Sequence, residues 1–229
     1  MSEMRIVPTE FTSAGERVRG DFVVPLGSGP FPGICQFHGL PGSRDHVSGI
    51  ASRLASCGFL VLTFDFRGFR RSDGLFRLSK EIEDAEHAVT HLLQSELSTK
   101  GWVGVYGSSY GGAVAICSTA RDRRIGCVCV EAPVYDTLAF AHSAIIQPAV
   151  ETLLREDPEF IHGLTDPALR KQMLEWMIED GARFNPMNEI SNISPRPLLI
   201  IAGDVTKLWI LPASGAFLNS RRSRRSLSL

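Results

Sequence analysis

The chain has 229 residues, 44% of them hydrophobic, and a formal net charge of −1. Its length suits one α/β domain with a sizeable core, and its nearly balanced charge gives no general attraction to nucleic acid or to a membrane. It contains no apolar run of about 18 residues that would span a bilayer, and its first residues show no apolar segment of a signal peptide. We therefore expect a cytoplasmic protein that binds neither nucleic acid nor membrane.

Apolar strands and amphipathic helices alternate along most of the chain. Strands are expected at 21–25, 33–37, 59–64, 102–106, 125–130 and 197–204. Helices are expected at 47–55, from an N-cap at Ser79 to about residue 93, and from Ser109 through the apolar stretch at 113–117. Residues 59–64 are almost all apolar, which is typical of a strand buried on both faces of a parallel sheet. The alternation predicts an α/β fold whose mostly parallel sheet collects its catalytic loops at the carboxyl ends of the strands.

The cysteines and two of the histidines raise the question of a metal or disulfide site. The five cysteines show no metal-binding or redox spacing: Cys35, Cys57, Cys117, Cys127 and Cys129. We expect them to be small buried hydrophobic side chains. His87 and His91 are four apart on one helix, but without a third ligand we expect a solvated helix face and no metal.

A strand-to-helix turn supplies the strongest functional signal. Gly107-Ser108-Ser109-Tyr110-Gly111 fits the G-x-S-x-G pattern of a nucleophile elbow and joins an apolar strand to an apolar helix. The pattern predicts that Ser109 projects its hydroxyl from the sheet edge, where the helix N-terminus faces a developing oxyanion. The alternative is a glycine-rich turn without catalytic function.

A second glycine turn follows the strand at 33–37. In His38-Gly39-Leu40-Pro41-Gly42, Pro41 has no N–H, which leaves the backbone of Leu40 as the expected oxyanion donor. His38 precedes the nucleophile in the chain, so we expect it to shape this loop and not to act as the catalytic base.

The strand–helix pattern changes between Tyr135 and Ser194. Asp166-Pro167 predicts the start of a helix that Gly181 ends. Four large apolar residues line one face of this helix: Leu169, Met173, Trp176 and Met177. Two interpretations stay open, a helical cap that covers the serine and shapes an acyl pocket, and a helix that merely packs on the sheet.

Five motifs together resemble the α/β-hydrolase superfamily, nearest to serine aminopeptidase-like and cinnamoyl (feruloyl) esterase-like members. They are Phe37-His38-Gly39-Leu40, Asp65-Phe66-Arg67-Gly68, Glu81-Ile82-Glu83-Asp84, the elbow with Gly112, and the strand from Pro197 to Asp204. The resemblance implies an α/β-hydrolase fold with a helical cap insertion. It also implies Ser109 as nucleophile, an oxyanion hole from the N–H groups of Leu40 and Tyr110, and hydrolysis of carboxylic esters, amides or thioesters of a small-molecule acyl substrate without cofactor or metal.

The other two members of the catalytic triad depart from the pattern of relatives. Relatives usually end the last strand in Gly-Asp-x-Asp, whereas this chain reads Gly203-Asp204-Val205-Thr206. Asp204 is a candidate acid if the loop is shifted, and Asp136 is the alternative. The last histidine in the chain is His162, so no histidine follows the acid, and only His142 and His162 in the cap offer an unusual route to Ser109. Without a general base a serine hydroxyl is a poor nucleophile.

The C-terminal stretch loses the family pattern after Val205. We expect a single domain over residues 1–229, with a core at about 20–134 and 195–211, a cap at about 135–194 and an atypical basic tail at 212–229. The terminal strand and helix of the family are expected to be missing, with 207–211 as a short substitute strand at an otherwise exposed edge.

Together these features predict a serine hydrolase that is inactive if no base replaces the triad histidine. A catalytically dead hydrolase-fold binding protein and a frameshifted product are the alternatives, and acyl transfer to an acceptor other than water uses the same site.

Overall fold

The computed structural model describes residues 4–42 and 45–203. Within these residues one sheet has the strand order β1-β2-β4-β3-β5-β6-β7. The β1–β2 and β2–β4 pairings are antiparallel, and the pairings from β4 through β3, β5 and β6 to β7 are parallel. The strands are β1 (Arg5–Ser13), β2 (Glu16–Val24), β3 (Gly33–Phe37), β4 (Leu60–Phe64), β5 (Val103–Ser108), β6 (Ile125–Glu131) and β7 (Leu198–Ile201). The mostly parallel α/β sheet predicted from the sequence is confirmed.

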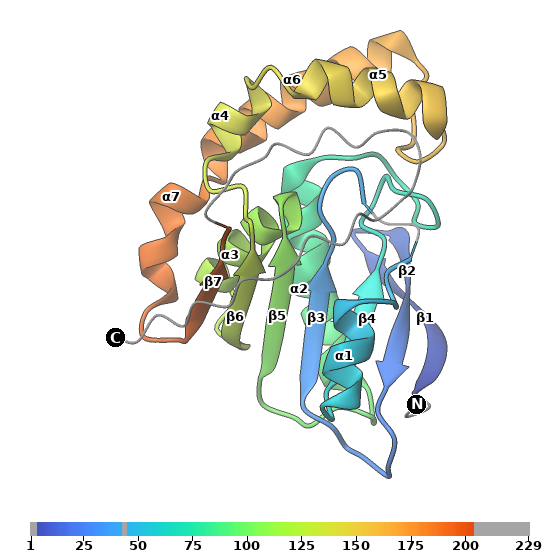
Figure 1. The fold of residues 1–229 in the computed structure, drawn as a ribbon, viewed down its shortest axis with the longest axis vertical. Helices are drawn as coiled ribbons and strands as arrows, with labels where there is room; N and C mark the ends of the chain where they lie inside the picture. The colour runs from blue at the N-terminus through green and yellow to red at the C-terminus, as the bar shows by residue number, and fades with distance from the viewer. Residues whose placement is uncertain (1–3, 43–44, 204–229) are drawn as a thin grey trace.

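Helices lie on both faces of the sheet and beyond the carboxyl ends of its strands (Figure 1). They are α1 (Ile50–Ser56), α2 (Leu78–Gln94), α3 (Tyr110–Arg121), α4 (Thr137–Ala141), α5 (Ile146–Glu156), α6 (Pro167–Arg183), α7 (Pro186–Glu189) and the 3-10 helix η1 (Ile190–Ile193). The main core lies between the sheet and helices α2 and α3, and α3 buries almost all of its residues. A small second core lies between α1 and strands β2 and β4 on the opposite face.

The N-terminal hairpin is the main element that the sequence did not predict. The expected strand at 21–25 begins earlier, at Glu16, and pairs along its whole length with β1, which lies before the predicted start of the core at about residue 20. Ala14 and Gly15 form its two-residue turn, both with positive φ, as such hairpins require. Polar residues interrupt β1, which hides it from a search for continuous apolar strands.

The same hairpin corrects the interpretation of the histidine pair. The ring of His91 stacks against Phe11 and Phe22 at centroid distances of 5.3 and 5.4 Å, and its Nε2 lies 2.7 Å from the hydroxyl of Thr9. His87 Nδ1 lies 3.1 Å from the hydroxyl of Ser13. The prediction of a solvated face was therefore wrong, because β1 covers it. No cluster of His, Cys, Asp or Glu suited to a metal occurs in the described residues.

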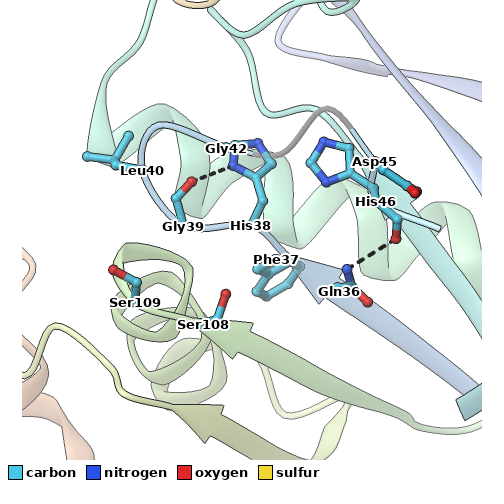
Figure 2. Close-up of a pocket in the computed structure, with 10 residues that line it drawn as sticks. All are labelled: Gln36, Phe37, His38, Gly39, Leu40, Gly42, Asp45, His46, Ser108 and Ser109. Carbon is cyan, nitrogen blue, oxygen red and sulfur yellow. Dashed lines mark hydrogen bonds between the residues drawn. The ribbon is translucent and has the colours of Figure 1, made fainter. Parts of the chain in front are cut away.

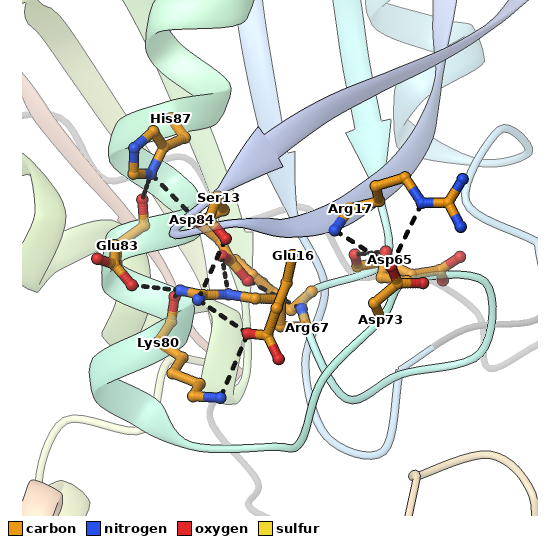
Figure 3. Close-up of polar contacts among 12 residues, drawn as sticks. Ser13, Glu16, Arg17, Asp65, Arg67, Asp73, Lys80, Glu83, Asp84 and His87 are labelled. Atoms are coloured by element: carbon orange, nitrogen blue, oxygen red, sulfur yellow. Dashed lines mark hydrogen bonds and ion pairs between the residues drawn. The ribbon is translucent and has the colours of Figure 1, made fainter.

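A buried arginine ties the hairpin to the sheet and to α2 (Figure 3). Arg67 lies in the loop after β4, and its Nε is 2.6 Å from Asp84 of α2. Its other guanidinium nitrogens contact Glu16 at 3.1 Å and Glu83 at 2.5 Å. Burial alone lowers the pKa of Arg67, but the facing carboxylates outweigh burial and raise it, so the guanidinium stays charged.

Helices α4, α5 and α6 lie beyond the carboxyl ends of the strands and not on a face of the sheet (Figure 1). This position favours the interpretation of the insert as a cap. Asp180 of α6 attaches it to α2, because its carboxylate accepts from Arg77 at 3.0 Å through two nitrogens and from the backbone N–H of Ser79 at 2.9 Å. Ser79 was expected to be the N-cap of α2. It lies inside the helix, and the carboxylate from α6 satisfies the N–H that a capping side chain normally takes.

Helix α6 begins as predicted and ends later than predicted. Asp166 is its N-cap and Pro167 its first residue, but the helix continues past Gly181 to Arg183. Gly181 serves close packing, since a Cβ there would lie 2.9 Å from the carbonyl oxygen of Thr137 in α4. The hydroxyl of Thr137 also donates to the carbonyl oxygens of Gly181 and Phe184. The glycine thus marks a helix–helix contact and not a helix end.

The predictions for the cysteines, for membrane-spanning helices and for the C-terminal residues have different outcomes. The described cysteines are unpaired, and Cys35 and Cys117 are buried as expected, but Cys57 is exposed, and Cys127 and Cys129 are partly exposed. None of the helices in the described ranges is long and apolar enough to cross a bilayer. The predictions for Asp204, for a strand at 207–211 and for a tail at 212–229 lie outside the described residues.

Candidate active site

The turn from β5 into α3 holds Ser109 in a strained conformation. Its φ of 52° and ψ of −120° lie in a region that side chains other than glycine rarely adopt. Ser108 is the last residue of β5, so the strained position singles out Ser109 as the serine at the apex of the turn. The Ser109 N–H donates to the carbonyl of Glu131 at 3.0 Å, and its own carbonyl accepts from Val134 at 2.9 Å. The end of β6 and the loop that follows it therefore fix the turn.

Three glycines allow the backbone to pass at this turn. A Cβ on Gly107 would lie 2.2 Å from the carbonyl oxygen of Gly111, and one on Gly111 would lie 2.4 Å from the carbonyl oxygen of His38. A Cβ on Gly39 would lie 3.0 Å from the Cβ of Ser109. The elbow thus packs directly against the loop after β3. The requirement for small flanking residues, inferred from the motif, has this close packing as its physical reason.

The two expected oxyanion donors come from the two segments that pack together here, the elbow and the loop after β3. Tyr110 is the first residue of α3, and Leu40 follows Gly39 in the loop that touches Ser109. In the described part of the chain, neither backbone N–H donates to an acceptor. Their role as oxyanion donors stays a prediction from the sequence.

His38 is a structural residue of the loop, as expected. Its Nδ1 lies 2.9 Å from the carbonyl oxygen of Gly39, and its Nε2 accepts from the N–H of Phe66 at 3.1 Å. These partners require a neutral ring with the proton on Nδ1. Burial, with a smaller contribution from the neighbouring His46, lowers the pKa of His38 to about 4, which keeps the ring neutral at pH 7.

A cavity of about 260 Å³ adjoins Ser109 (Figure 2). The ends of β3 and β5 and the loop after β3 form its walls, and no residue of the helical insert lines it. Its lining is polar at the end away from Ser109, where Gln36, Asp45 and His46 lie. The amide oxygen of Gln36 is buried without a hydrogen-bond partner, and its amide nitrogen donates to the carbonyl of His46.

A histidine–aspartate pair beside this cavity was missed by sequence reasoning. His46 Nε2 lies 2.7 Å from Asp65, whose second oxygen accepts from Arg71 at 2.7 Å. Burial raises the pKa of Asp65, but hydrogen bonds from His46 and Arg71 outweigh burial and lower it. The pair joins residues 19 positions apart, and nothing in their spacing indicates it. The structure gives His46 no hydrogen bond to Ser109.

The structure does not bring the other expected triad residues to Ser109. Both ring nitrogens of His162 face carbonyl oxygens of the loop after β4, those of Gly74 at 3.2 Å and Arg70 at 3.0 Å. His142 ends α4 and does not line the cavity. Asp136 is the N-cap of α4, and the N–H of Ala139, followed by the Asn185 amide, lowers its pKa. Asp204 lies outside the described residues. Within the described part of the chain, no basic group contacts the Ser109 hydroxyl.

The chain is similar to one known protein family and to solved structures of the same fold. Residues 14–176 match the model of the X-Pro dipeptidyl-peptidase (S15) family, which is most of the chain. The α/β hydrolase GrgF from Penicillium sp. sh18 has a similar structure, with a TM-score of 0.65 and 21% identity over 86% of this chain and 80% of that one. At this identity the likeness concerns the fold alone.

Two curated proteins are similar over about half of the chain. The quorum-quenching protein AidA of Acinetobacter baumannii is 29% identical over 122 residues, which cover 51% of this chain and 40% of that protein. The acyl-coenzyme A thioesterase 3 of Mus musculus is 36% identical over 114 residues, which cover 48% of this chain and 24% of that protein. The chain thus spans less than half the length of these relatives.

Proposed function

The chain belongs to the X-Pro dipeptidyl-peptidase (S15) family of the α/β-hydrolase superfamily, and on that premise we propose that it cleaves carboxylic ester, amide or thioester bonds of a small-molecule acyl substrate through an acyl-enzyme on Ser109. The observation that carries this proposal is the strained backbone of Ser109 between two unpartnered N–H groups. Hydrolase-fold relatives, a thioesterase among them, support a hydrolase function in general.

In the proposed reaction the Ser109 oxygen attacks the substrate carbonyl carbon and the hydroxyl proton leaves to a base. The carbonyl oxygen takes up the negative charge and accepts from the N–H groups of Leu40 and Tyr110. Collapse of this intermediate expels the alcohol, amine or thiol and leaves an ester on Ser109. Water then attacks that ester and releases the acid. No step needs a metal or cofactor.

Without a general base to take the Ser109 proton, the proposed reaction is slow. Loss of a triad residue in a serine protease costs roughly 10⁴ to 10⁶ in rate, while the oxyanion hole and binding still give about 10³ to 10⁴ over water. Acid–base partners for Ser109, with Asp204 as candidate acid, stay predictions from the sequence. Cytoplasmic location and the absence of nucleic-acid and membrane partners are likewise predictions.

Labelling with a fluorophosphonate probe tests the proposal. We expect covalent label on the tryptic peptide that contains Ser109, and we expect Ser109→Ala to abolish it. Ser108→Ala is the matched control, because Ser108 is the adjacent hydroxyl in regular strand geometry, and this variant should label like the unmodified protein. Label that is absent from the folded protein, or that survives Ser109→Ala, contradicts the proposal.

Three histidines already have partners within the protein, which favours a second candidate function, the binding of an acyl ligand without turnover. Both ring nitrogens of His38 and of His162 have partners in the loops, and His46 is paired with Asp65. In that case the probe does not label the protein, yet an acyl product such as a carboxylic acid raises Tm. Ser109→Trp, which fills the space beside the oxyanion donors, should remove that shift.

A further inference from the structure

A histidine with one unpartnered ring nitrogen lines the cavity beside Ser109. The side chain of His46 is buried, and its Nε2 lies 2.7 Å from Asp65. In the described part of the chain its Nδ1 has no hydrogen-bond partner, and protein atoms do not fully enclose this nitrogen. Because the His46 ring lines the cavity, Nδ1 opens onto it. Figure 2 shows the ring next to that of His38, at the end of β3.

The partners of Asp65 fix the tautomer of His46. Arg71 donates to the second carboxylate oxygen of Asp65 at 2.7 Å, and its guanidinium is always charged. Beside this cation Asp65 is ionised and can only accept, so the proton of a neutral His46 ring lies on Nε2. A lone pair is left on Nδ1, on the side of the cavity. A carboxylate in this position also stabilises the imidazolium that forms when the ring takes up a proton.

Water in the cavity can connect Nδ1 to an acyl group on Ser109. The ring centroids of His38 and His46 are 5.2 Å apart, and a Cβ on Gly39 would lie 3.6 Å from the Ser109 hydroxyl oxygen. His46 is thus the next side chain beyond the loop that touches Ser109. The volume of about 260 Å³ far exceeds the roughly 10–15 Å³ that one water needs. The cavity therefore has room for a water between the two side chains.

We propose that His46 is the general base of deacylation, the step in which water attacks the acyl group on Ser109. This inference rests on the proposed function. The water oxygen bonds to the acyl carbonyl carbon, and the water proton passes to Nδ1 of His46. The bond between that carbon and the Ser109 oxygen then breaks, and the serine oxygen takes a proton back from the imidazolium. The products are a carboxylic acid and free Ser109, while Asp65 keeps its charge throughout.

The position of His46 fits deacylation and not acylation. Acylation needs a base in contact with the Ser109 hydroxyl, and His46 makes no such contact. In deacylation the nucleophile is water, which the cavity can bring to Nδ1. The competing interpretation is a structural role, in which His46 and Asp65 only hold the loop after β3 against the loop after β4.

Hydrolysis of p-nitrophenyl acetate separates the two steps. The initial burst of nitrophenolate reports acylation, and the steady rate that follows reports deacylation. His46→Gln is the informative variant, because its amide N–H can still donate to Asp65 but the side chain has no basic nitrogen. We expect an unchanged burst and a steady rate that falls by about 10² to 10⁴, the usual contribution of a general base. His87→Gln is the matched control, since His87 contacts Ser13 away from the cavity, and should change neither value.

Added imidazole distinguishes a base from a structural residue. In His46→Ala, which opens space beside Asp65, imidazole should restore part of the steady rate, whereas His46→Gln fills that space and should not respond. A steady rate that imidazole leaves unchanged in His46→Ala overturns the inference. An unchanged steady rate in His46→Gln also overturns it, while the burst and the label on Ser109 leave the proposed function standing. Absence of burst and label in the unmodified protein refutes the proposed function, and the inference with it.

Asp65→Asn keeps the test decisive if the His46 variants do not fold, which loss of a cooperative thermal transition would show. Arg71 still donates to residue 65, so the amide oxygen must face Arg71 and the amide NH₂ must face His46. The NH₂ then donates to Nε2, which moves the ring proton to Nδ1 and removes the lone pair from the cavity. We expect an unchanged burst and a similar loss of the steady rate. A folded Asp65→Asn protein with an unchanged steady rate overturns the inference.

Discussion

The Nδ1 of His38 lies 2.9 Å from the carbonyl oxygen of Gly39, and this contact fixes the peptide unit that carries the Leu40 N–H. The Gly39–Leu40 bond is not among the cis peptide bonds of the described chain, so the Gly39 carbonyl and the Leu40 N–H point to opposite sides of one plane. Holding the carbonyl toward His38 therefore turns the N–H away from the imidazole. His38 is thus a positioning residue for the proposed oxyanion hole.

Removing this contact should slow acylation of Ser109. We expect His38→Ala to lower the fluorophosphonate labelling rate by roughly 10² to 10³, the usual cost of losing one oxyanion donor. His38→Asn keeps an N–H donor near the Gly39 carbonyl and should recover part of the rate. His87→Ala, remote from the cavity, is the control. Equal labelling of His38→Ala and the unmodified protein would show that this contact does not position the donor.

The free energy of unfolding should decrease as the pH is lowered, because the fold holds His38 in its neutral form. Its pKa is about 4 when folded, against 6.5 for the free side chain, so the unfolded chain binds more protons between these values. The stabilisation is fully present above pH 6.5 and is lost as the pH falls toward 4, to a total of up to about 3 kcal/mol. Urea unfolding at several pH values measures it. His38→Asn should show a shallower loss over the same range, and an identical pH profile would contradict the assignment.

The contact between cap and core depends on one buried carboxylate. Asp180 accepts from Arg77 and from the Ser79 N–H, and its side chain is almost fully buried. Asp180→Ala leaves that N–H and the partly buried guanidinium without their partner, so we expect a loss of about 3 kcal/mol in the free energy of unfolding. Glu179→Ala is the control, because Glu179 pairs with the same arginine from an exposed position and should cost less than about 1 kcal/mol. Equal costs for the two variants would refute the role of burial.

The elbow should not tolerate a methyl group at Gly111. A Cβ there would lie 2.4 Å from the carbonyl oxygen of His38 and 2.5 Å from that of Phe37. Because both contacts are with backbone, Gly111→Ala must displace the loop after β3, and we expect a destabilisation of about 3 kcal/mol or more with loss of labelling at Ser109. In Gly203→Ala the new Cβ meets nothing within 4 Å, so this variant should leave both properties unchanged. Thermal unfolding of the two variants decides the point.

Local sequence patterns determined the central architecture of this protein. Nearly continuous apolar runs predicted β4 and β5 to within two residues, because strands buried on both faces need apolar side chains at almost every position. The mainly apolar segments at 33–37 and 125–130 predicted β3 and β6 equally closely. The G-x-S-x-G spacing placed the turn at Ser109, since only small residues let the backbone pass there. These features depend on neighbours in the chain, and a sequence displays neighbours directly.

Only the tertiary structure decided the features that join distant segments. The carboxylate of Asp180 caps a helix 101 residues earlier, His91 packs under a hairpin strand, and His46 pairs with Asp65. Gly181 looked like a helix end because its contact with Thr137 is invisible in the sequence. Each of these contacts depends on which elements the fold brings together. A side chain's partner across space leaves no periodicity or spacing along the chain, so the sequence alone cannot reveal it.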